Sequence, residues 1–442
     1  MKFFQTIRNI FRIEDLRARI LYTLLIVALY RLGKYITLPG IDPSLLANLK
    51  GQTSSGIMGL LDMFSGGAFS QASVFALGIM PYISASIVIQ LLGIVFPYFQ
   101  KMQKEGESGR RKLNQYTRYL TVFILALQGP SYLANLHAVL PAEAFVLNGT
   151  FFTISSVIIL TAGTIFVMWL GERITDKGIG NGISLIIMVG ILSRFPASFI
   201  FEAGTRINGS GGLVALLVEI VFLFLVILAS ILLVQGTRRI PVQYARRIVG
   251  NKQYGGVRQY IPLKVNAAGV MPIIFAQAIM MLPIIFAGYA ESGSGIVVAF
   301  TNMYGFWYNL ITALMIIVFT YFYTAVTINP VQMAEDMKKN GGFVPGIKPG
   351  RKTVEFIDTV MSRITLPGSI FLALVAIMPA FAVNAGVSGE FAQFFGGTSL
   401  LILVGVVLDT LQQVESHLLM RHYDGLMKSG RVKGRTGAVT AI

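Results

Sequence analysis

The stretch GLLDMFSGGAFSQASVFALGIMPYISASIVIQ, residues 59–90, decides the fold. A short apolar stretch, residues 57–64, ends before the Gly66-Gly67 pair, and the apolar run that follows carries Gly78 and Pro81. Crossing the hydrocarbon of a bilayer takes about 20 apolar residues, so the first stretch is too short and is typical of a re-entrant segment. Irregular backbone at membrane depth is tolerated only where protein or a water-filled cavity satisfies its polar groups. The segment therefore predicts a cavity inside a membrane bundle, and hence a transport function.

The composition also indicates a membrane protein. Of 442 residues, 54% are hydrophobic and only 13% are charged, and the mean hydropathy is +0.69. These values lie far from those of soluble domains. The chain has no Cys, which excludes disulfides, thiolate metal sites and cysteine nucleophiles. The first residues, MKFFQTIRNIFRIEDLRARI, lack a small-residue cleavage site, so we expect a basic amphipathic arm and not a removed signal peptide.

Hydropathy predicts ten membrane-spanning helices. They cover residues 19–38, 75–95, 117–136, 151–171, 183–201, 213–234, 266–289, 306–328, 367–385 and 398–418. An even number of spans puts all but five of the 36 Lys and Arg residues on the side of the N-terminus. The five exceptions are Arg31, Lys34, Lys50, Arg194 and Arg206. Because positive charge stays on the cytoplasmic side, both termini are predicted to be cytoplasmic.

Much of the formal net charge of +16 lies in two long connections, residues 235–265 and 329–366. Orientation together with attraction to anionic lipid could account for most of this charge. However, the two connections are longer than orientation requires, and long loops are usually functional. A basic cytoplasmic platform could also dock an acidic protein or ribosomal RNA, because phosphates attract Lys and Arg. Charge alone leaves both interpretations open.

The second and seventh spans share a sequence pattern. The string GIMPYISA, residues 78–85, matches GVMPIIFA, residues 269–276, at Gly, Met, Pro, Ile and Ala with a constant offset of 191. Each string lies in the second span of a set of five. Because five is odd, the two halves must enter the membrane with opposite orientations. An inverted repeat of this kind predicts a working site near the midplane, between the halves.

Several long strings resemble the SecY family, the channel subunits of the bacterial protein-translocation complex. They are FSGGAFSQASVFALGIMPYISASI (64–87), KEGESGRRKLNQYTRY (104–119), MWLGERITDKGIGNGIS (168–184), PLKVNAAGVMPIIFA (262–276), NGGFVPGIKPG (340–350) and FFGGTSLLI (394–402). The resemblance implies an all-α polytopic protein of the bacterial cytoplasmic membrane, with two inverted five-helix halves around a central pore. The arm would be 1–18, the halves 19–205 and 206–418, and the cytoplasmic tail 419–442. The implied function is a passive channel that passes unfolded secretory polypeptides and releases signal sequences and transmembrane segments sideways into lipid.

The resemblance also implies a pore closed by apolar side chains and a plug. The pore ring would consist of Ile79, Ile83, Ile183, Ile187, Ile274 and Ile402. Isoleucine is stiff at its first side-chain torsion, and apolar constrictions gate by dewetting. From the residues alone, Ile79 and Ile83 are one face of a helix, and ordinary core packing is the alternative. Ile183 directly follows the polar string GERITDKGIGNG, which the resemblance would place in a water-filled cytoplasmic funnel.

The plug would be a short helix over residues 57–70 that is only loosely held, with the alternative of a static re-entrant loop. Its expected plug and hinge residues are Leu60, Leu61, Asp62, Phe64, Gly66 and Gly67. The second, third, seventh and eighth spans would form a lateral gate. Its expected residues are Pro81, Gln90, Gln128 and Gln277. Polar contacts between membrane helices are worth roughly 0.6–2 kcal/mol, weak enough for an apolar signal peptide to compete with them.

The implied partners are SecE, usually SecG, the SecA motor, the ribosome, signal-bearing polypeptides and membrane lipids, including anionic ones. Docking would use Arg238, Arg239, Arg246, Arg247, Lys348 and Arg351. The family usually has Arg where this chain has Lys348, and Lys lacks the planar fork that binds a carboxylate through two bonds. The resemblance implies no cofactor and no enzymatic activity of the chain itself.

Other functions fit the sequence less well. An ion-coupled secondary transporter also uses inverted repeats, but it needs ionisable residues at the midplane. The acids within the predicted spans, Glu219 and Asp409, lie toward span ends and have no recognisable partner in the sequence. The three histidines, His137, His417 and His422, lack metal-ligand spacing, so we expect no metal site.

Overall fold

The computed structural model describes residues 13–46, 62–147, 149–209, 212–244, 247–249, 252–254, 258–287 and 302–429, and these are mainly helical. The first part of the chain contains α2 (Glu14–Gly33), α5 (Met80–Val95), α6 (Pro97–Lys104), α7 (Glu107–Val139), α8 (Thr150–Lys177), α9 (Gly182–Leu192) and α10 (Phe195–Asn208). The second part contains α11 (Gly212–Gln235), α12 (Met271–Ala287), α14 (Phe306–Thr327), α15 (Pro330–Lys339), α16 (Arg351–Asn384), α17 (Gly389–Ala392) and α18 (Gly397–Ser429). Short 3-10 turns are η1 (Pro43–Leu45), η2 (Ala142–Ala144) and η3 (Gln393–Phe395).

Every predicted span contains a helix, although several boundaries differ. Among the described residues, seven helical segments are long and apolar enough to cross a membrane, and the bent pair α5–α6 would make an eighth. The prediction for residues 75–95 is wrong at its start, because residues 75–79 form turns before α5. The span 183–201 is broken between α9 and α10. Pro196, the second residue of α10, has no N–H to offer the carbonyl of Leu192, where α9 ends.

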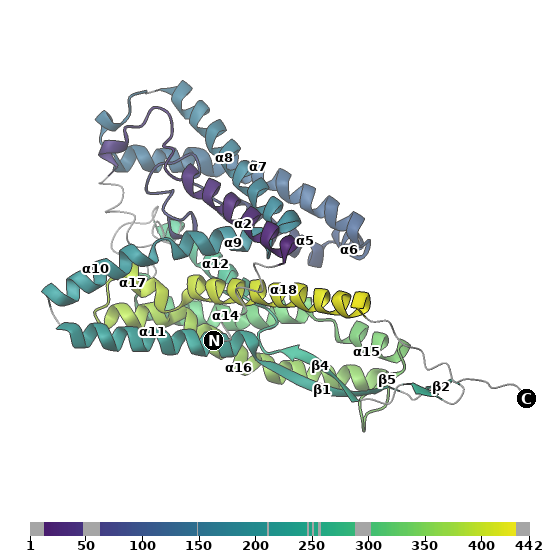
Figure 1. Ribbon diagram of the computed structural model, residues 1–442. Helices are drawn as coiled ribbons and strands as arrows, with labels where there is room; N and C mark the ends of the chain where they lie inside the picture. The colour runs from purple at the N-terminus through teal and green to yellow at the C-terminus, as the bar shows by residue number, and fades with distance from the viewer. Residues whose placement is uncertain are drawn as a thin grey trace, which may run out of the picture.

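The helices pack in the same order within each half. We count the spans of each half from one to five. In both halves the second span contacts the third, and the fourth span contacts the first, the third and the fifth. In both halves the second span begins at the repeated motif: Gly78 and Gly269 have φ of +55° and +64°, and Met80 and Met271 open α5 and α12. Positive φ suits glycine because it has no Cβ. The halves meet where α9 packs against α18, which lies between the blue and green helices in Figure 1.

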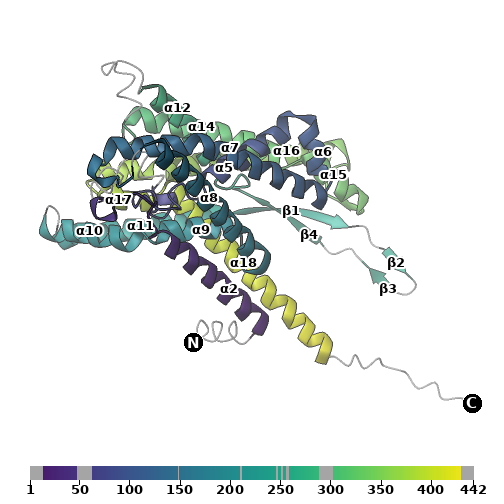
Figure 2. The same cartoon turned by 90° about the horizontal axis from the view of Figure 1, so that it is seen from above.

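One end of the bundle carries a small sheet. We call this end of the molecule the basic end, because the strands of the sheet carry Arg238, Arg239, Arg258 and Lys264. Strand β1 (Thr237–Tyr244) pairs antiparallel with β4 (Arg258–Lys264), with Ile240 opposite Ile261, and its far end also pairs with β5 (Gly342–Phe343). A separate two-stranded ladder joins β2 (Arg247–Val249) to β3 (Lys252–Tyr254). Figure 2 shows β2 and β3 projecting away from the helices. From the sequence, only loops were predicted for these residues.

Helix α16 connects this sheet to the bundle. It has 34 residues, whereas the prediction covered only 367–385. Its first turns pack Ile357 and Met361 against Ile240 and Val242 of the sheet. Its later turns join the core of the second half, where Leu372 is fully buried. The sheet therefore rests on the extension of a membrane-spanning helix.

Candidate functional site

The predicted ring residues meet in the apolar core between the two halves, with one exception. Ile79, Ile187 and Ile402 are buried there, and Ile83 and Ile183 pack against them. The exception is Ile274: it is half-buried on α12 and does not belong to this cluster. Side chains from α5, α9 and α18 therefore close the centre of the molecule without any charged group among them.

The polar string before Ile183 is held by hydrogen bonds to side chains from three helices. The Gly182 N–H donates to Oγ1 of Thr175 on α8 (2.9 Å), and the Gly180 N–H donates to Oε1 of Gln413 on α18 (2.9 Å). The Ile179 N–H donates to Oγ1 of Thr23 on α2 (3.2 Å). These bonds satisfy the backbone of the turn between α8 and α9 and fix the start of α9. The turn positions Ile183 and Ile187 one helical turn apart on a short helix.

Residues 62–70 occupy the space next to the ring. Met63 and Phe64 belong to the same apolar cluster as the ring isoleucines. The prediction of a helix over 57–70 is wrong for its later part: only 62–64 are helical among the described residues, and 65–70 form turns. Leu60 and Leu61 lie outside the described residues. Gly66 and Gly67 have φ of +67° and +85°, so the predicted hinge glycines make the sharp turn.

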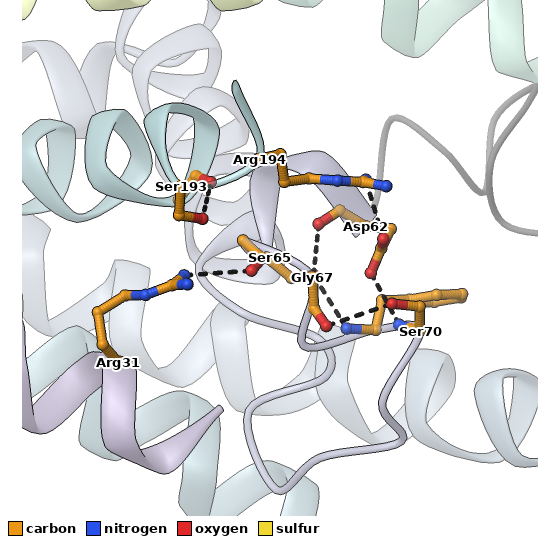
Figure 3. Close-up of polar contacts among 10 residues, drawn as sticks. Arg31, Asp62, Ser65, Gly67, Ser70, Ser193 and Arg194 are labelled. Atoms are coloured by element: carbon orange, nitrogen blue, oxygen red, sulfur yellow. Dashed lines mark hydrogen bonds and ion pairs between the residues drawn. The ribbon is translucent and has the colours of Figure 1, made fainter. Parts of the chain in front are cut away.

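The polar groups of this segment are buried and hydrogen-bonded, contrary to the expectation of a loosely held helix. Asp62 and Ser65 are only 1% and 2% exposed. Asp62 Oδ2 pairs with Nη1 of Arg194 at 2.9 Å, while Asp62 Oδ1 accepts the Ser70 N–H at 2.7 Å (Figure 3). The Asp62 carbonyl accepts the Gly67 N–H at 2.7 Å. Removing Arg194 would leave the buried Asp62 carboxylate without its counter-ion, which costs about 3–5 kcal/mol.

Two more cations reach the same turn. Arg31 of α2 donates from Nη1 to the Gly66 carbonyl at 3.2 Å. Lys34 lies so close that a Cβ built on Gly67 would be 2.7 Å from its Nζ. Arg31, Lys34 and Arg194 are three of the five basic residues that the topology places away from the basic end. Arg31 and Arg194 contact a backbone carbonyl and the carboxylate of the 62–70 segment, and Lys34 lies beside Gly67.

The segment also approaches α9 at a glycine. A Cβ built on Gly66 would lie 2.9 Å from Cα of Gly190, and one built on Gly190 would lie 3.3 Å from the Phe64 carbonyl oxygen. A side chain at Gly66 would force a shift of the backbone, and one at Gly190 would require its neighbours to move by a few tenths of an ångström. Ring residues and a docking point for the 62–70 segment therefore share one helix of eleven residues.

The predicted gate residues are distributed unevenly. Gln90 of α5 accepts at Oε1 a hydrogen bond from the Tyr323 hydroxyl of α14 at 3.4 Å, which joins the two halves across the seam. Gln277 accepts from Thr398 of α18 at 3.4 Å, a contact inside the second half. The side chain of Gln128 is exposed on α7 and forms no hydrogen bond with another side chain among the described residues. Pro81 is buried as the second residue of α5.

The predicted docking residues lie at the basic end. Arg238 and Arg239 are exposed on β1, and Lys348 and Arg351 are exposed before and at the start of α16. Arg351 lies 3.4 Å from Glu355, one turn along the same helix. Arg247 begins β2, whereas Arg246 lies outside the described residues. The four exposed cations are thus carried by the sheet and by α16, which support one another.

A second buried ionic cluster was missed by the sequence analysis, which found no partner for Glu219. Arg206 of α10 pairs with Glu202 at 3.1 Å and with Glu219 of α11 at 2.5 Å. It also donates to the Gly386 carbonyl at 2.7 Å, and Glu202 accepts the Ser388 N–H at 2.9 Å. The cluster ties α10 and α11 to the loop before α17. The i, i+4 spacing of Glu202 and Arg206 was the signal in the sequence.

No group of three or more His, Asp or Glu residues suited to a metal ion occurs in the part of the chain that the structure describes. The site is instead a mechanical arrangement. An apolar constriction lies between two halves, a buried segment is held against it by cations, and a long hydrogen bond links α5 of one half to α14 of the other. Such an arrangement can close and open a path without chemistry of its own.

The chain is similar to known proteins over most of its length. The SecY family model matches residues 73–411. The protein translocase subunit SecY of Corynebacterium glutamicum is 43% identical over 441 residues, covering 95% of this chain and 98% of that protein. Among solved structures, SecY in a study of how its plug domain stabilizes the closed translocation channel has a TM-score of 0.64, 18% identity and 95% coverage of both chains. Sec61 in a canine ribosome-channel complex has a TM-score of 0.58, again with 18% identity and 95% coverage of both chains.

Proposed function

The chain belongs to the SecY family and is a protein-conducting translocation channel, and we propose that residues 62–70 are its plug and the isoleucine cluster its pore ring. The observation that carries this proposal is the apolar cluster itself. Met63 and Phe64 pack on the ring residues where the two halves meet, so residues 62–70 would have to move for a path to open there. The described form is therefore a closed channel.

We further propose that the seam between α5 and α14 belongs to the lateral gate. Within each half, α5 packs on α7 and α12 packs on α14, whereas the side-chain hydrogen bond that joins α5 to α14 among the described residues is the long Tyr323–Gln90 bond. Few strong contacts therefore oppose separation along this line. A signal peptide could part the helices there, since its apolar burial outweighs one interhelical bond of roughly 0.6–2 kcal/mol.

The charge distribution supports an orientation and a set of partners. The basic end would face the bacterial cytoplasm, with both termini on that side. Arg238, Arg239, Lys348 and Arg351 would dock the SecA motor or the ribosome, and a relative of the same fold is known in a ribosome-channel complex. SecE and SecG would complete the channel in the membrane. An ion-coupled transporter is disfavoured because Glu219 is already paired with Arg206.

The lateral-gate proposal can be tested by cross-linking, and the absence of Cys from the chain makes the experiment clean. Cysteines at Gln90 and Tyr323 are bridged with a short bifunctional maleimide. The channel is reconstituted with SecE and SecA, and translocation is measured as protease protection of a signal-bearing substrate. We expect bridging to block protection. If the bridging is complete and the substrate is still protected as well as with the wild-type channel, the assignment of this seam to the lateral gate is refuted.

The matched control bridges two helices of the same half. Arg118 of α7 and Glu172 of α8 are in direct contact, with an Nη2–Oε2 distance of 2.6 Å. Cysteines at these positions should bridge equally well and leave translocation unchanged, because α7 and α8 stay together in the first half. A block in both pairs would indicate general damage by the reagent.

A further inference from the structure

The Asp62–Arg194 ion pair joins the plug segment to the break after α9, the helix that carries two ring residues. Asp62 is buried, and its two carboxylate oxygens have different partners, Arg194 and the Ser70 N–H. The side chain of Arg194 is 22% exposed, so it is more accessible than its partner. Moving the plug away would leave Arg194 facing the vacated space.

Arg194 occupies the break between α9 and α10, just after the ring helix. Ser193 caps α9, and Arg194 precedes α10. Arg194 is therefore four residues from Gly190, which contacts the plug, and seven residues from the ring residue Ile187. A displacement of α9 that widens the ring would move the guanidinium of Arg194 with it. The ring and the ion pair are consequently coupled by one short element.

A second carboxylate borders the same space. A small cavity beside the plug is lined by Met63, Arg194 and Glu390, with Ser198, Gln393 and Phe394. Glu390 lies on α17 in the second half, and it takes part in no ion pair among the described residues. The loop before α17 is anchored, because the Ser388 N–H donates to Glu202. Glu390 is thus a fixed acceptor next to a cation whose present partner lies on the plug.

We propose that Arg194 is a positioning residue that holds the plug closed through Asp62 and exchanges this partner for Glu390 when the plug leaves. A cation removed from its partner in a largely buried place is unfavourable unless another acceptor replaces it. The exchange supplies that acceptor. Arg194 would then pair with Glu390 of the second half instead of with Asp62 of the plug. The proposal rests on the assignment of residues 62–70 as the plug.

The closed state is tested first. Channels reconstituted with their partner subunits are assayed for ion leak in proteoliposomes, using an encapsulated halide-sensitive dye. Arg194→Gln and Asp62→Asn should each raise the leak by about tenfold or more, and the double variant should leak no more than the worse single variant. Arg194→Lys keeps the charge and should stay near the wild type. A wild-type leak in Arg194→Gln, or equal leak in the Lys and Gln variants, would overturn the ion-pair role.

The exchange is tested separately by opening. Glu390→Gln should slow SecA-driven translocation severalfold, because Arg194 then lacks its second acceptor. Glu143→Gln, an exposed carboxylate on η2, is the control and should translocate normally. Equal rates in Glu390→Gln and wild type would overturn the exchange. Folding is checked in every variant by assembly with the partner subunits, and the charge swap Asp62→Arg with Arg194→Asp should recover part of the seal.

Deleting residues 62–70 separates this proposal from the plug assignment. If the deletion does not raise the leak, the plug assignment itself is wrong. If the deletion leaks while Arg194→Gln stays sealed, the plug stands and the role of Arg194 falls.

Discussion

Replacing Gly190 by Ala is expected to destabilise the closed channel. The added Cβ would lie 3.3 Å from three atoms: Cα and N of Gly66 and the carbonyl oxygen of Phe64. All three belong to the backbone of a turn that Arg194 and Arg31 hold in place, so they cannot rotate away as a flexible side chain would. To accept the new methyl group, the plug segment or α9 must therefore move by a few tenths of an ångström.

The expected size follows from the energy of overpacking. Extra carbon in a well-packed core costs typically about 1–3 kcal/mol. Because about 1.4 kcal/mol is a tenfold change in an equilibrium constant, the ratio of open to closed channels should rise roughly 5- to 150-fold. In a proteoliposome leak assay the basal flux should rise in proportion while few channels are open. Translocation of a substrate with a weakened signal sequence should improve as well.

The control is Gly204→Ala on α10, where a Cβ would meet nothing within 4 Å. This variant should leak like the wild type, because alanine is simply a better helix former there. A Gly190→Ala channel that assembles normally and leaks no more than Gly204→Ala would refute the reasoning. It would mean that the approach of α9 to the plug contributes nothing to closure.

Three further predictions concern other contacts. Arg206→Ala leaves two buried carboxylates without their cation and should lower the stability of the complex by about 3–5 kcal/mol in thermal unfolding. Arg351 is exposed, so Arg351→Ala should change the stability by less than about 1 kcal/mol, and equal melting temperatures of the two variants would contradict this. Tyr323→Phe removes the bond to Gln90 and should increase signal-peptide cross-linking at the seam about 3- to 30-fold, and unchanged cross-linking would remove this bond from the gate. Arg239→Glu should slow SecA-driven translocation, most strongly at low salt, and a rate insensitive to both charge and salt would sink the docking assignment.

The sequence was sufficient for the helices because lipid-facing side chains must be apolar over the thickness of the membrane. The match between residues 78–85 and 269–276 lies at two equivalent helix starts, Met80 and Met271, although hydropathy predicted that these spans begin at residues 75 and 266. Helix ends were less predictable. α16 and α18 continue beyond the apolar stretch as polar helices, and hydropathy cannot detect such extensions.

The sheet at the basic end and the polar contacts of the plug were harder to foresee. Ile240 and Val242 alternate with exposed residues in β1, a period-two signal that the basic charge of the connection obscured. The role of Asp62 could not be predicted, since its partner Arg194 is 132 positions away and only the fold brings them together. Ile274 lies outside the ring cluster. Its counterpart in the first half of the sequence, Ile83, packs against the cluster.

Helix α16 gives the molecule a long arm. At 1.5 Å per residue its 34 residues extend about 51 Å, well beyond the roughly 30 Å hydrocarbon core of a bilayer. The outer part supports the sheet through Ile357, and the inner part is embedded in the second half through Leu372. Pro367 and Pro379 lie inside α16 and favour a bend, but for a straight helix of that length a tilt of roughly 5° would move the outer tip by about 4 Å. A partner bound to the tip would therefore have leverage over the whole second half, and could turn it against the first without reaching into the membrane.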